Sequence, residues 1–410
     1  MRVLILNQPF HPDVAATAQH AHDLARYLVQ QGHQVDVVAS RSIYGQTGAT
    51  LPRFEVMDGA IEVHRVGVSI FGKRGIAARL ADFLLFYALA ALKVLTLPRA
   101  DVVVTLTTPP FIGLLGAILA KLRGSRWVYW AMDLYPDVPV ALGVMKPDSI
   151  LTLGFEALNR WCLHHADRTV ALGRCMKALI ESKGIPPAKV DWIGVWAANQ
   201  PQETDPAASS YRAEWKLHDR FVVMYSGNLG LAHDAETLVA AAERLQHCED
   251  IRFVFVGSGK RMAEIRDRAR ALPNTDLYGY QPRERLADLL AAANLHLISQ
   301  LRAFTGIVVP SKLYGIMAAG RASIFVGPQD AEVALELTES NAGITLPVGD
   351  ADALVHAIEQ LAADRPRCKQ LGDNALAAAR DKHAVEHRCA AWERVLLDVV
   401  HTSRDQEIAP

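Results

Sequence analysis

The stretch FVVMYSGNLGLAHD, residues 221–234, has the form of a buried β-strand that ends in a glycine-containing loop and leads into a helix. Its apolar start is typical of a strand inside a parallel sheet. Glycines at the end of such a strand let the backbone approach a phosphate, and the free amides of a following helix stabilise the phosphate charge. The segment FVGSGKR, residues 255–261, has the same form. Tight turns alone would also explain either loop.

The same alternation of short strands and amphipathic helices runs along the whole chain and predicts an α/β protein with parallel sheets. The first half contains strand candidates at 2–6, 34–40, 61–66, 101–106, 126–130 and 168–172. The second half contains others at 221–227, 251–259, 276–280, 295–300 and 323–327. A polar stretch rich in alanine and proline, residues 197–220, interrupts the pattern and predicts a linker without a strand.

These features predict two α/β domains in tandem. Their expected bounds are residues 1–198 for the first domain, 199–220 for the linker and domain entry, and 221–385 for the second domain. A final helix over 386–410 could pack back on the first domain. Ligands in such sheets bind beyond the carboxyl ends of the strands, so the loops at those ends are the candidate sites.

Composition excludes some classes of function. The 410 residues include 43 Lys and Arg against 44 Asp and Glu, a formal net charge of −1, which gives no support to a nucleic-acid binder. Five scattered cysteines, without a CxxC pair, indicate reduced, cytoplasmic chemistry. The amino-terminal segment is predicted to be a first strand and not a signal peptide.

One uncharged run, residues 102–120, is long enough to span a bilayer. Its central TLTTPP favours a buried strand, a turn and a helix start instead. The region 71–97 combines an apolar segment with Lys73, Arg74 and Arg79. It is therefore a candidate for peripheral contact with a membrane surface.

The segment VVPSKLYGIMAAG, residues 308–320, follows Gly306 and begins a predicted helix. Ser311 is a candidate N-cap, and Lys312 adds a positive charge where backbone amides already point. A diphosphate is the ligand that suits this combination. A capped helix with a solvated lysine is the alternative.

Other candidates lie at strand ends. Asp133 follows the strand at 126–130 and could orient a sugar hydroxyl or accept its proton, although an Asx-type turn before Pro136 is equally consistent with the sequence. Arg174 could meet a phosphate or cap a helix. No strand is followed by a complete GxGxxG, so a nicotinamide-dependent dehydrogenase is poorly supported.

Seven segments, in this order along the chain, resemble glycosyltransferase family 4, the retaining GT-B enzymes, and in particular the branch that assembles bacterial surface polysaccharides. The segments are LNQPFHPDVAATAQ (6–19), LTTPPFIGLLG (106–116), VYWAMDLYPDVPVALGV (128–144), ADRTVALGRCM (166–176), FVVMYSGNLGLAHD (221–234), FVGSG (255–259) and VVPSKLYGIMAAGR (308–321). The resemblance implies a GT-B architecture, with two Rossmann-like domains facing across a cleft. It also implies that the second domain binds the nucleotide-sugar donor and the first binds the acceptor.

The resemblance assigns roles to particular residues. Asp133 and Lys312 are the catalytic candidates. The donor-binding candidates are Gly227, Asn228, His233, Gly257, Gly259, Tyr280, Gln281, Thr305, Gly306, Ile307, Val308, Ser311 and Lys312. The acceptor-side candidates are Ala16, His20, Asp133 and Arg174. No metal ligand and no cofactor are expected.

This chain departs from the family pattern at several positions. Gly315 stands where many members have a glutamate that holds the donor ribose, as in a sub-branch that reads SKLYG, and Thr305 stands where that sub-branch tends to have glutamate. Asn228 and His233 replace a basic pair, and Met132 replaces a histidine. Backbone groups, Ser311 and Lys312 are therefore expected to carry more of the donor binding.

The resemblance implies a retaining, metal-independent transfer of a hexosyl or N-acetylhexosaminyl group to a lipid-linked glycan, with a UDP-linked donor favoured over a GDP-linked one. The expected partners are the donor, a polyprenyl-diphosphate-linked sugar acceptor and the inner membrane surface, with no nucleic acid. The expected location is cytoplasmic, peripheral on the inner face of the cytoplasmic membrane. A nucleotide-sugar epimerase of the same fold and a non-catalytic donor-binding partner protein are the alternatives.

Overall fold

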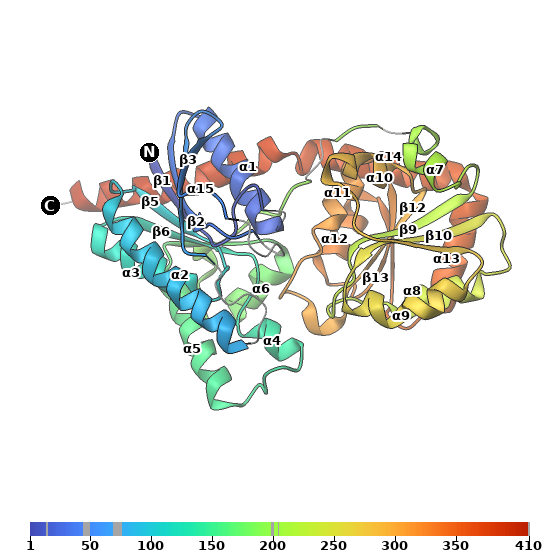
Figure 1. The fold of residues 1–410 in the computed structure, drawn as a ribbon, viewed down its shortest axis with the longest axis horizontal. Coiled ribbons are helices and arrows are strands. Elements are labelled where there is room, and N and C mark those ends of the chain that lie inside the picture. Colours follow the sequence, from blue (N-terminus) through green and yellow to red (C-terminus); the bar gives the residue numbers. More distant parts are fainter. Residues whose placement is uncertain (14, 44–49, 69–75, 198–200, 204, 409–410) are drawn as a thin grey trace. The chain divides into compact units, whose positions relative to one another are not determined.

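The computed structural model describes residues 1–408 apart from 14, 44–49, 69–75, 198–200 and 204, and it describes no side chains for 76–79 and 402–408. The chain forms two compact units. Unit 1 comprises Met1–Gly194 and the carboxyl-terminal segment from Val385, and unit 2 comprises Val195–Ala384. Each unit is an α/β layer structure with helices on both faces of one sheet (Figure 1).

Within its described residues, unit 1 contains an eight-stranded sheet in the order β3-β4-β2-β1-β5-β6-β7-β8. Its strands are β1 (Arg2–Leu6), β2 (Gln34–Ser40), β3 (Phe54–Met57), β4 (Ile61–Val66), β5 (Val102–Thr105), β6 (Arg126–Ala131), β7 (Arg168–Ala171) and β8 (Val190–Trp192). All pairings are parallel except that of β3 with β4. The central strands are buried on both faces, which explains their continuous apolar sequences.

The helices of unit 1 follow the strands in the right order for parallel crossovers. They are α1 (Ala16–Gln30), α2 (Ile76–Thr96), α3 (Ile112–Arg123), α4 (Asp137–Ala141), α5 (Ile150–His165), α6 (Arg174–Ser182) and α15 (Val385–Ile408). The last of these, α15, returns from the far end of the chain and packs on α1, β5 and β6. Its Trp392 is buried against Trp130 of β6, with ring centroids 4.4 Å apart.

Unit 2 contains a parallel six-stranded sheet in the order β11-β10-β9-β12-β13-β14. Its strands are β9 (Phe221–Asn228), β10 (Ile251–Ser258), β11 (Thr275–Tyr278), β12 (Leu295–Ser299), β13 (Ala322–Val326) and β14 (Gly343–Leu346). Its helices are α7 (Ser210–Glu214), α8 (Glu236–Arg244), α9 (Lys260–Ala271), α10 (Leu286–Ala291), α11 (Lys312–Ala318), α12 (Glu332–Ser340), α13 (Ala351–Ala363) and α14 (Arg365–Lys382). Alternate residues of β9 enter different cores: Phe221, Val223 and Tyr225 join one, and Val222 and Met224 join the other.

The predicted fold class is confirmed: both units are parallel α/β structures, and β2 has the predicted bounds. Three strands were not predicted, namely β3, β8 and β14, and each lies at an edge of its sheet. Edge strands are short and partly exposed, so they lack the continuous apolar run that marks a central strand.

The uncharged run at 102–120 forms β5, a turn and the start of α3, as its prolines predicted. In the part of the chain that the structure describes, no helix has the length and apolar character needed to cross a bilayer. Lys73, Arg74 and the Arg79 side chain lie outside the described residues.

Candidate functional site

In unit 2, three neighbouring parallel strands bring the predicted donor-binding loops to one edge of the sheet. The strands β10, β9 and β12 lie side by side, and Gly257 of β10 pairs in register with Gly227 of β9. The loop after β12 continues from Gln300 to Ser311 and leads into α11. Loops from separate parts of the sequence therefore meet where parallel α/β sheets bind ligands.

The glycines at these strand ends are required because the loop backbones touch each other. A Cβ atom on Gly257 would lie 2.2 Å from the carbonyl oxygen of Gly227, and one on Gly259 would lie 2.3 Å from that of Leu229. Both glycines also have positive φ, at 121° and 134°, which side chains disfavour. The close packing of the two loops thus accounts for Gly257 and Gly259.

Lys312 is the first residue of α11, and its ammonium group is buried. Nζ lies 3.6 Å from the centre of the Tyr225 ring and makes no hydrogen bond to any described residue. Burial lowers the pKa of Lys312 to about 7, because a charged amine without a partner is unfavourable away from water. The solvated lysine considered as the alternative is therefore wrong.

The absence of a side chain at Gly227 leaves room for this amine. A Cβ atom at that position would lie 3.7 Å from Nζ of Lys312. Tyr225, two residues earlier in β9, is fully buried, and its hydroxyl donates a hydrogen bond to the carbonyl oxygen of Asn228. The strand end thus supplies both the ring beneath the amine and the space beside it.

His233 lies close to the same amine and is neutral. Its Nδ1 donates a hydrogen bond to the carbonyl oxygen of Ser299, at the end of β12. Burial and the nearby charge of Lys312 lower the pKa of His233 to about 4. At neutral pH the imidazole is therefore a hydrogen-bonding group and does not replace the charge of a basic pair.

The loop before α11 is held in place by Gln300, a buried residue that was not among the predicted site residues. Its side-chain amide donates hydrogen bonds of 3.0 Å to the carbonyl oxygens of Phe304 and Val308. Inside this loop, Gly306 has a φ of 77°, and Ile307 is buried. The Thr305 hydroxyl is buried without a hydrogen-bond partner among the described residues.

The expected N-cap at Ser311 is wrong. Its side chain makes no capping hydrogen bond, and the residue is exposed. Its backbone, with φ −62° and ψ −19°, is already helical, whereas a capping side chain normally requires an extended backbone. The first turn of α11, which begins at Lys312, is therefore not capped by the Ser311 side chain.

Of the other donor-side candidates, Tyr280 and Asn228 are exposed and Gln281 is partly buried. Tyr280 is 63% exposed and interacts electrostatically with Tyr225. Gln281 accepts a hydrogen bond from the Tyr211 hydroxyl, and Asn228 is exposed. Both exposed candidates, Tyr280 and Asn228, therefore interact with Tyr225.

In unit 1, Asp133 and Arg174 follow the neighbouring strands β6 and β7. No described residue donates a hydrogen bond to the Asp133 carboxylate, and burial raises its pKa to about 6. The Asx-type turn therefore finds no support in the described contacts. Arg174 begins α6 and stacks its guanidinium 4.7 Å from the centre of the Trp192 ring.

The remaining acceptor-side candidates lie in α1. Ala16 is its first residue, and His20 is buried within it. Among the residues that prediction missed, Gln300 and Tyr225 have a signal in the sequence. Gln300 is a polar residue directly after the apolar strand β12, and Tyr225 is an aromatic residue two positions before Gly227 in β9.

Both parts of the chain match known glycosyltransferase families. Residues 16–196 match the family described as "Glycosyl transferase 4-like domain", and residues 209–377 match "Glycosyl transferases group 1". A Pseudomonas aeruginosa protein named "Probable glycosyltransferase WbjE" is 29% identical over 64% of this chain and 66% of its own length. An Escherichia coli (strain K12) protein named "Putative colanic acid biosynthesis glycosyl transferase WcaI" is 27% identical over 88% of this chain and 92% of its own length.

The fold is also found among solved structures. HepE of Anabaena, solved in complex with UDP and glucose, superposes with a TM-score of 0.70 and 16% identity, and the match covers 97% of this chain and 100% of HepE. With two family matches that together take in most of both units, the chain belongs to the family 4 glycosyltransferases and has their GT-B fold.

Proposed function

We propose that this glycosyltransferase moves a hexosyl or N-acetylhexosaminyl group, with retention at the anomeric carbon, from a UDP-linked sugar to a polyprenyl-diphosphate-linked glycan during assembly of a surface polysaccharide. The name of WcaI, which refers to colanic acid biosynthesis, supports the polysaccharide. The complex of HepE with UDP and glucose supports the donor.

The observation that carries the donor site is the buried amine of Lys312, which has no hydrogen-bond partner among the described residues. A buried lysine without a hydrogen-bond partner is unstable unless a ligand supplies an anion. The diphosphate of a nucleotide sugar is such an anion, and a charge-assisted hydrogen bond from Nζ would be strong in this environment. Lys312 therefore takes the role that a divalent cation has in other transferases, and we propose that transfer needs no metal.

Asp133 is the proposed acceptor-side catalytic residue. Retention without a covalent intermediate requires the acceptor hydroxyl on the face from which the diphosphate departs. The bond from the anomeric carbon to the diphosphate breaks, the bond to the acceptor oxygen forms, and the departing phosphate takes up the hydroxyl proton. An ionised Asp133 would accept a hydrogen bond from the acceptor sugar and hold it in place.

An exposed apolar surface on unit 1 supports the proposal of a lipid-linked acceptor. Helices α2, α3 and α5 pack side by side, α2 on α3 and α3 on α5 (Figure 1). Their exposed apolar side chains, each at least 39% exposed, are Leu80, Leu84, Leu92, Leu95, Ile118, Leu122, Ile150, Leu151, Leu153 and Trp161. We call this set the apolar helix face.

Basic residues accompany this face. Lys121 is exposed beside Leu122 on α3, and Lys146 is exposed just before α5. Apolar side chains that enter the interface, together with cations that attract anionic lipid headgroups, are the elements of peripheral membrane binding. We propose that the apolar helix face docks on the inner surface of the cytoplasmic membrane, where a polyprenyl-linked acceptor is available.

The donor proposal is tested by calorimetric titration of the protein with UDP, GDP and UMP. We expect UDP to bind more tightly than GDP and UMP. We expect Lys312→Ala to weaken UDP binding by about 1.5–3 kcal/mol, roughly tenfold to a hundredfold.

The affinity of the native protein for UDP should also fall as pH rises above 7, because the neutral Lys312 amine must take up a proton to bind the anion. Lys369→Ala, which removes an exposed lysine of α14, is the matched control. Equal UDP affinity in the folded Lys312→Ala and Lys369→Ala variants would exclude Lys312 from the donor site.

A further inference from the structure

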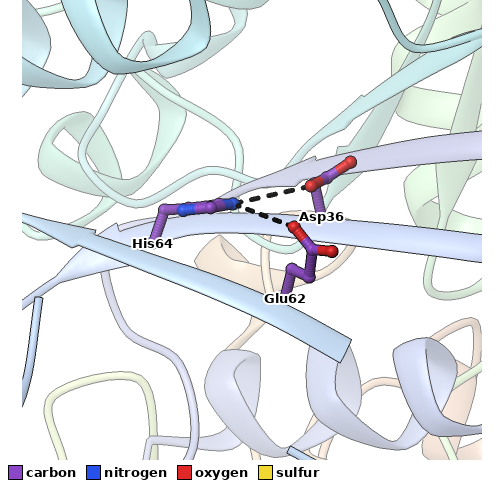
Figure 2. A group of neighbouring side chains, drawn as sticks. All are labelled: Asp36, Glu62 and His64. Atoms are coloured by element: carbon purple, nitrogen blue, oxygen red, sulfur yellow. Dashed lines mark ion pairs between the residues drawn. The ribbon is translucent and has the colours of Figure 1, made fainter. Parts of the chain in front are cut away.

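A cluster of three side chains in unit 1 lies on the strands β2 and β4, apart from the proposed donor and acceptor residues. Asp36 of β2 pairs in register with Glu62 of β4, and His64 follows two residues later on the same face of the strand. Figure 2 shows both carboxylates directed at Nε2 of the imidazole. One nitrogen and two oxygen atoms thus all lie within 4.8 Å of one another.

The distances in this cluster are longer than those of the other histidine–carboxylate pairs among the described residues, which span 2.7 to 3.2 Å. Nε2 of His64 is 3.5 Å from Asp36 and 3.7 Å from Glu62. In comparison, His22 lies 2.7 Å from Asp58. Charge-assisted hydrogen bonds measure about 2.7–2.9 Å. His64 is therefore near two carboxylates without forming a hydrogen bond to either, and its Nε2 is buried without a partner among the described residues.

We propose that Asp36, Glu62 and His64 bind a divalent transition-metal cation, with Zn²⁺ the best match. Zinc binds imidazole nitrogen and carboxylate oxygen at about 2.0–2.2 Å in tetrahedral geometry, so two ligand atoms are about 3.4 Å apart. The separations of 3.5 and 3.7 Å from Nε2 of His64 to the two carboxylates are close to that value, and the two carboxylate oxygen atoms lie within 4.8 Å of each other. A mixed nitrogen and oxygen donor set also favours zinc over Mg²⁺, which prefers oxygen alone.

Arg2 holds the Asp36 carboxylate in place. Its guanidinium lies 2.6 Å from Oδ2 of Asp36 and 3.2 Å from Oδ1, the oxygen that faces His64. Burial opposes the charge on Asp36, but the contacts with His64 and Arg2 outweigh it and lower the Asp36 pKa. Arg2 therefore orients an anionic ligand from behind, as hydrogen-bonding partners of metal ligands commonly do.

The proposed metal site is open to solvent on one side only, that of Glu62. The Asp36 and His64 side chains are only 3% and 7% exposed, whereas that of Glu62 is 48% exposed. A cation can enter from the Glu62 side, and water can supply the fourth ligand there. The bound cation would join β2 to β4 and stabilise unit 1, while the transfer reaction remains independent of metal.

The test measures bound metal directly. The full-length protein is stripped with a chelator, incubated with Zn²⁺ or Mg²⁺, and passed through a gel-filtration column before its metal content and unfolding temperature are determined. We expect one zinc per chain, no retained magnesium, and a higher unfolding temperature with zinc. A native chain that retains no zinc at micromolar free metal would overturn the proposal.

Matched variants locate the zinc. His64→Gln and Glu62→Gln are expected to lower zinc affinity by more than about tenfold, and Glu62→Gln should fold normally because its side chain is half-exposed. His22→Gln, which disrupts a histidine paired with a single carboxylate, should retain native zinc affinity. Native zinc affinity in both His64→Gln and Glu62→Gln would show that zinc binds elsewhere and would reject this site. UDP binding serves as a separate readout, since it depends on Lys312 in unit 2 and should be unchanged in these variants.

Discussion

Lys312 is a residue whose burial favours ligand binding at the expense of stability. Lys312→Met keeps the length and apolar character of the side chain but removes the buried amine. We expect the ligand-free variant to unfold at a higher temperature than the native protein and to bind UDP more weakly. If Lys312→Met were less stable than the native protein at pH 6, the Lys312 amine would have to make a stabilising interaction in the folded protein, and the prediction would be wrong.

The pH dependence of this stability difference has a definite sign. Between about pH 7 and 10.5, the unfolded chain holds a proton on Lys312 that the folded chain lacks. The free energy of unfolding contributed by Lys312 therefore rises with pH, by about 1.4 kcal/mol per unit. Thermal unfolding from pH 6 to 9 should show the advantage of Lys312→Met shrinking as pH rises, and a constant advantage would exclude a lowered lysine pKa.

Asp133 is expected to act on turnover and not on donor binding. Asp133→Asn keeps the shape of the side chain and removes its charge, so we expect a large fall in turnover with UDP affinity nearly native. Because burial raises the pKa of Asp133 to about 6, native turnover should rise as pH increases through 6, and the variant should lack this rise. Lower stability with near-native turnover per folded molecule would instead indicate a structural role.

At the scale of elements, the close approach of β9 and β10 makes Gly257 indispensable. Gly257→Ala would place a Cβ atom 2.2 Å from the Gly227 carbonyl oxygen at a φ of 121°, which we expect to cost about 2 kcal/mol or more. Gly279→Ala, at a position with nothing within 4 Å, should change stability by less than about 0.5 kcal/mol. Denaturant unfolding of the two variants provides the comparison, and equal stabilities would contradict the described loop packing.

At the scale of the whole molecule, the apolar helix face predicts reversible membrane binding. We expect the protein to sediment with vesicles that contain phosphatidylglycerol and less with pure phosphatidylcholine. Leu84→Ser and Leu92→Ser should each reduce binding by about 1 kcal/mol, since each removes a half-exposed apolar side chain. Val348→Ser, at an exposed apolar residue of unit 2, is the control. Native vesicle binding in the double leucine variant would exclude this face as the docking surface.

The sequence by itself determined the fold class and the position of the strand-end loops. Both depend on local properties: a central parallel strand needs a continuous apolar run, and a glycine marks a backbone that turns or closely approaches another. β2 was predictable for this reason. The edge strands β3, β8 and β14 were not, because partial exposure removes the apolar signal.

Only the tertiary structure decided which side chains are buried and what they meet there. The sequence does not show whether Lys312 is solvated or buried, and the structure shows its amine over the Tyr225 ring of β9. The sequence also allows Ser311 to be an N-cap, whereas in the structure its backbone is already helical. Likewise, Asp36 is 26 or more residues from Glu62 and His64, and strand register alone brings them together. Burial and partners are long-range properties, so pKa values and ligand geometry follow from the folded chain and not from local sequence.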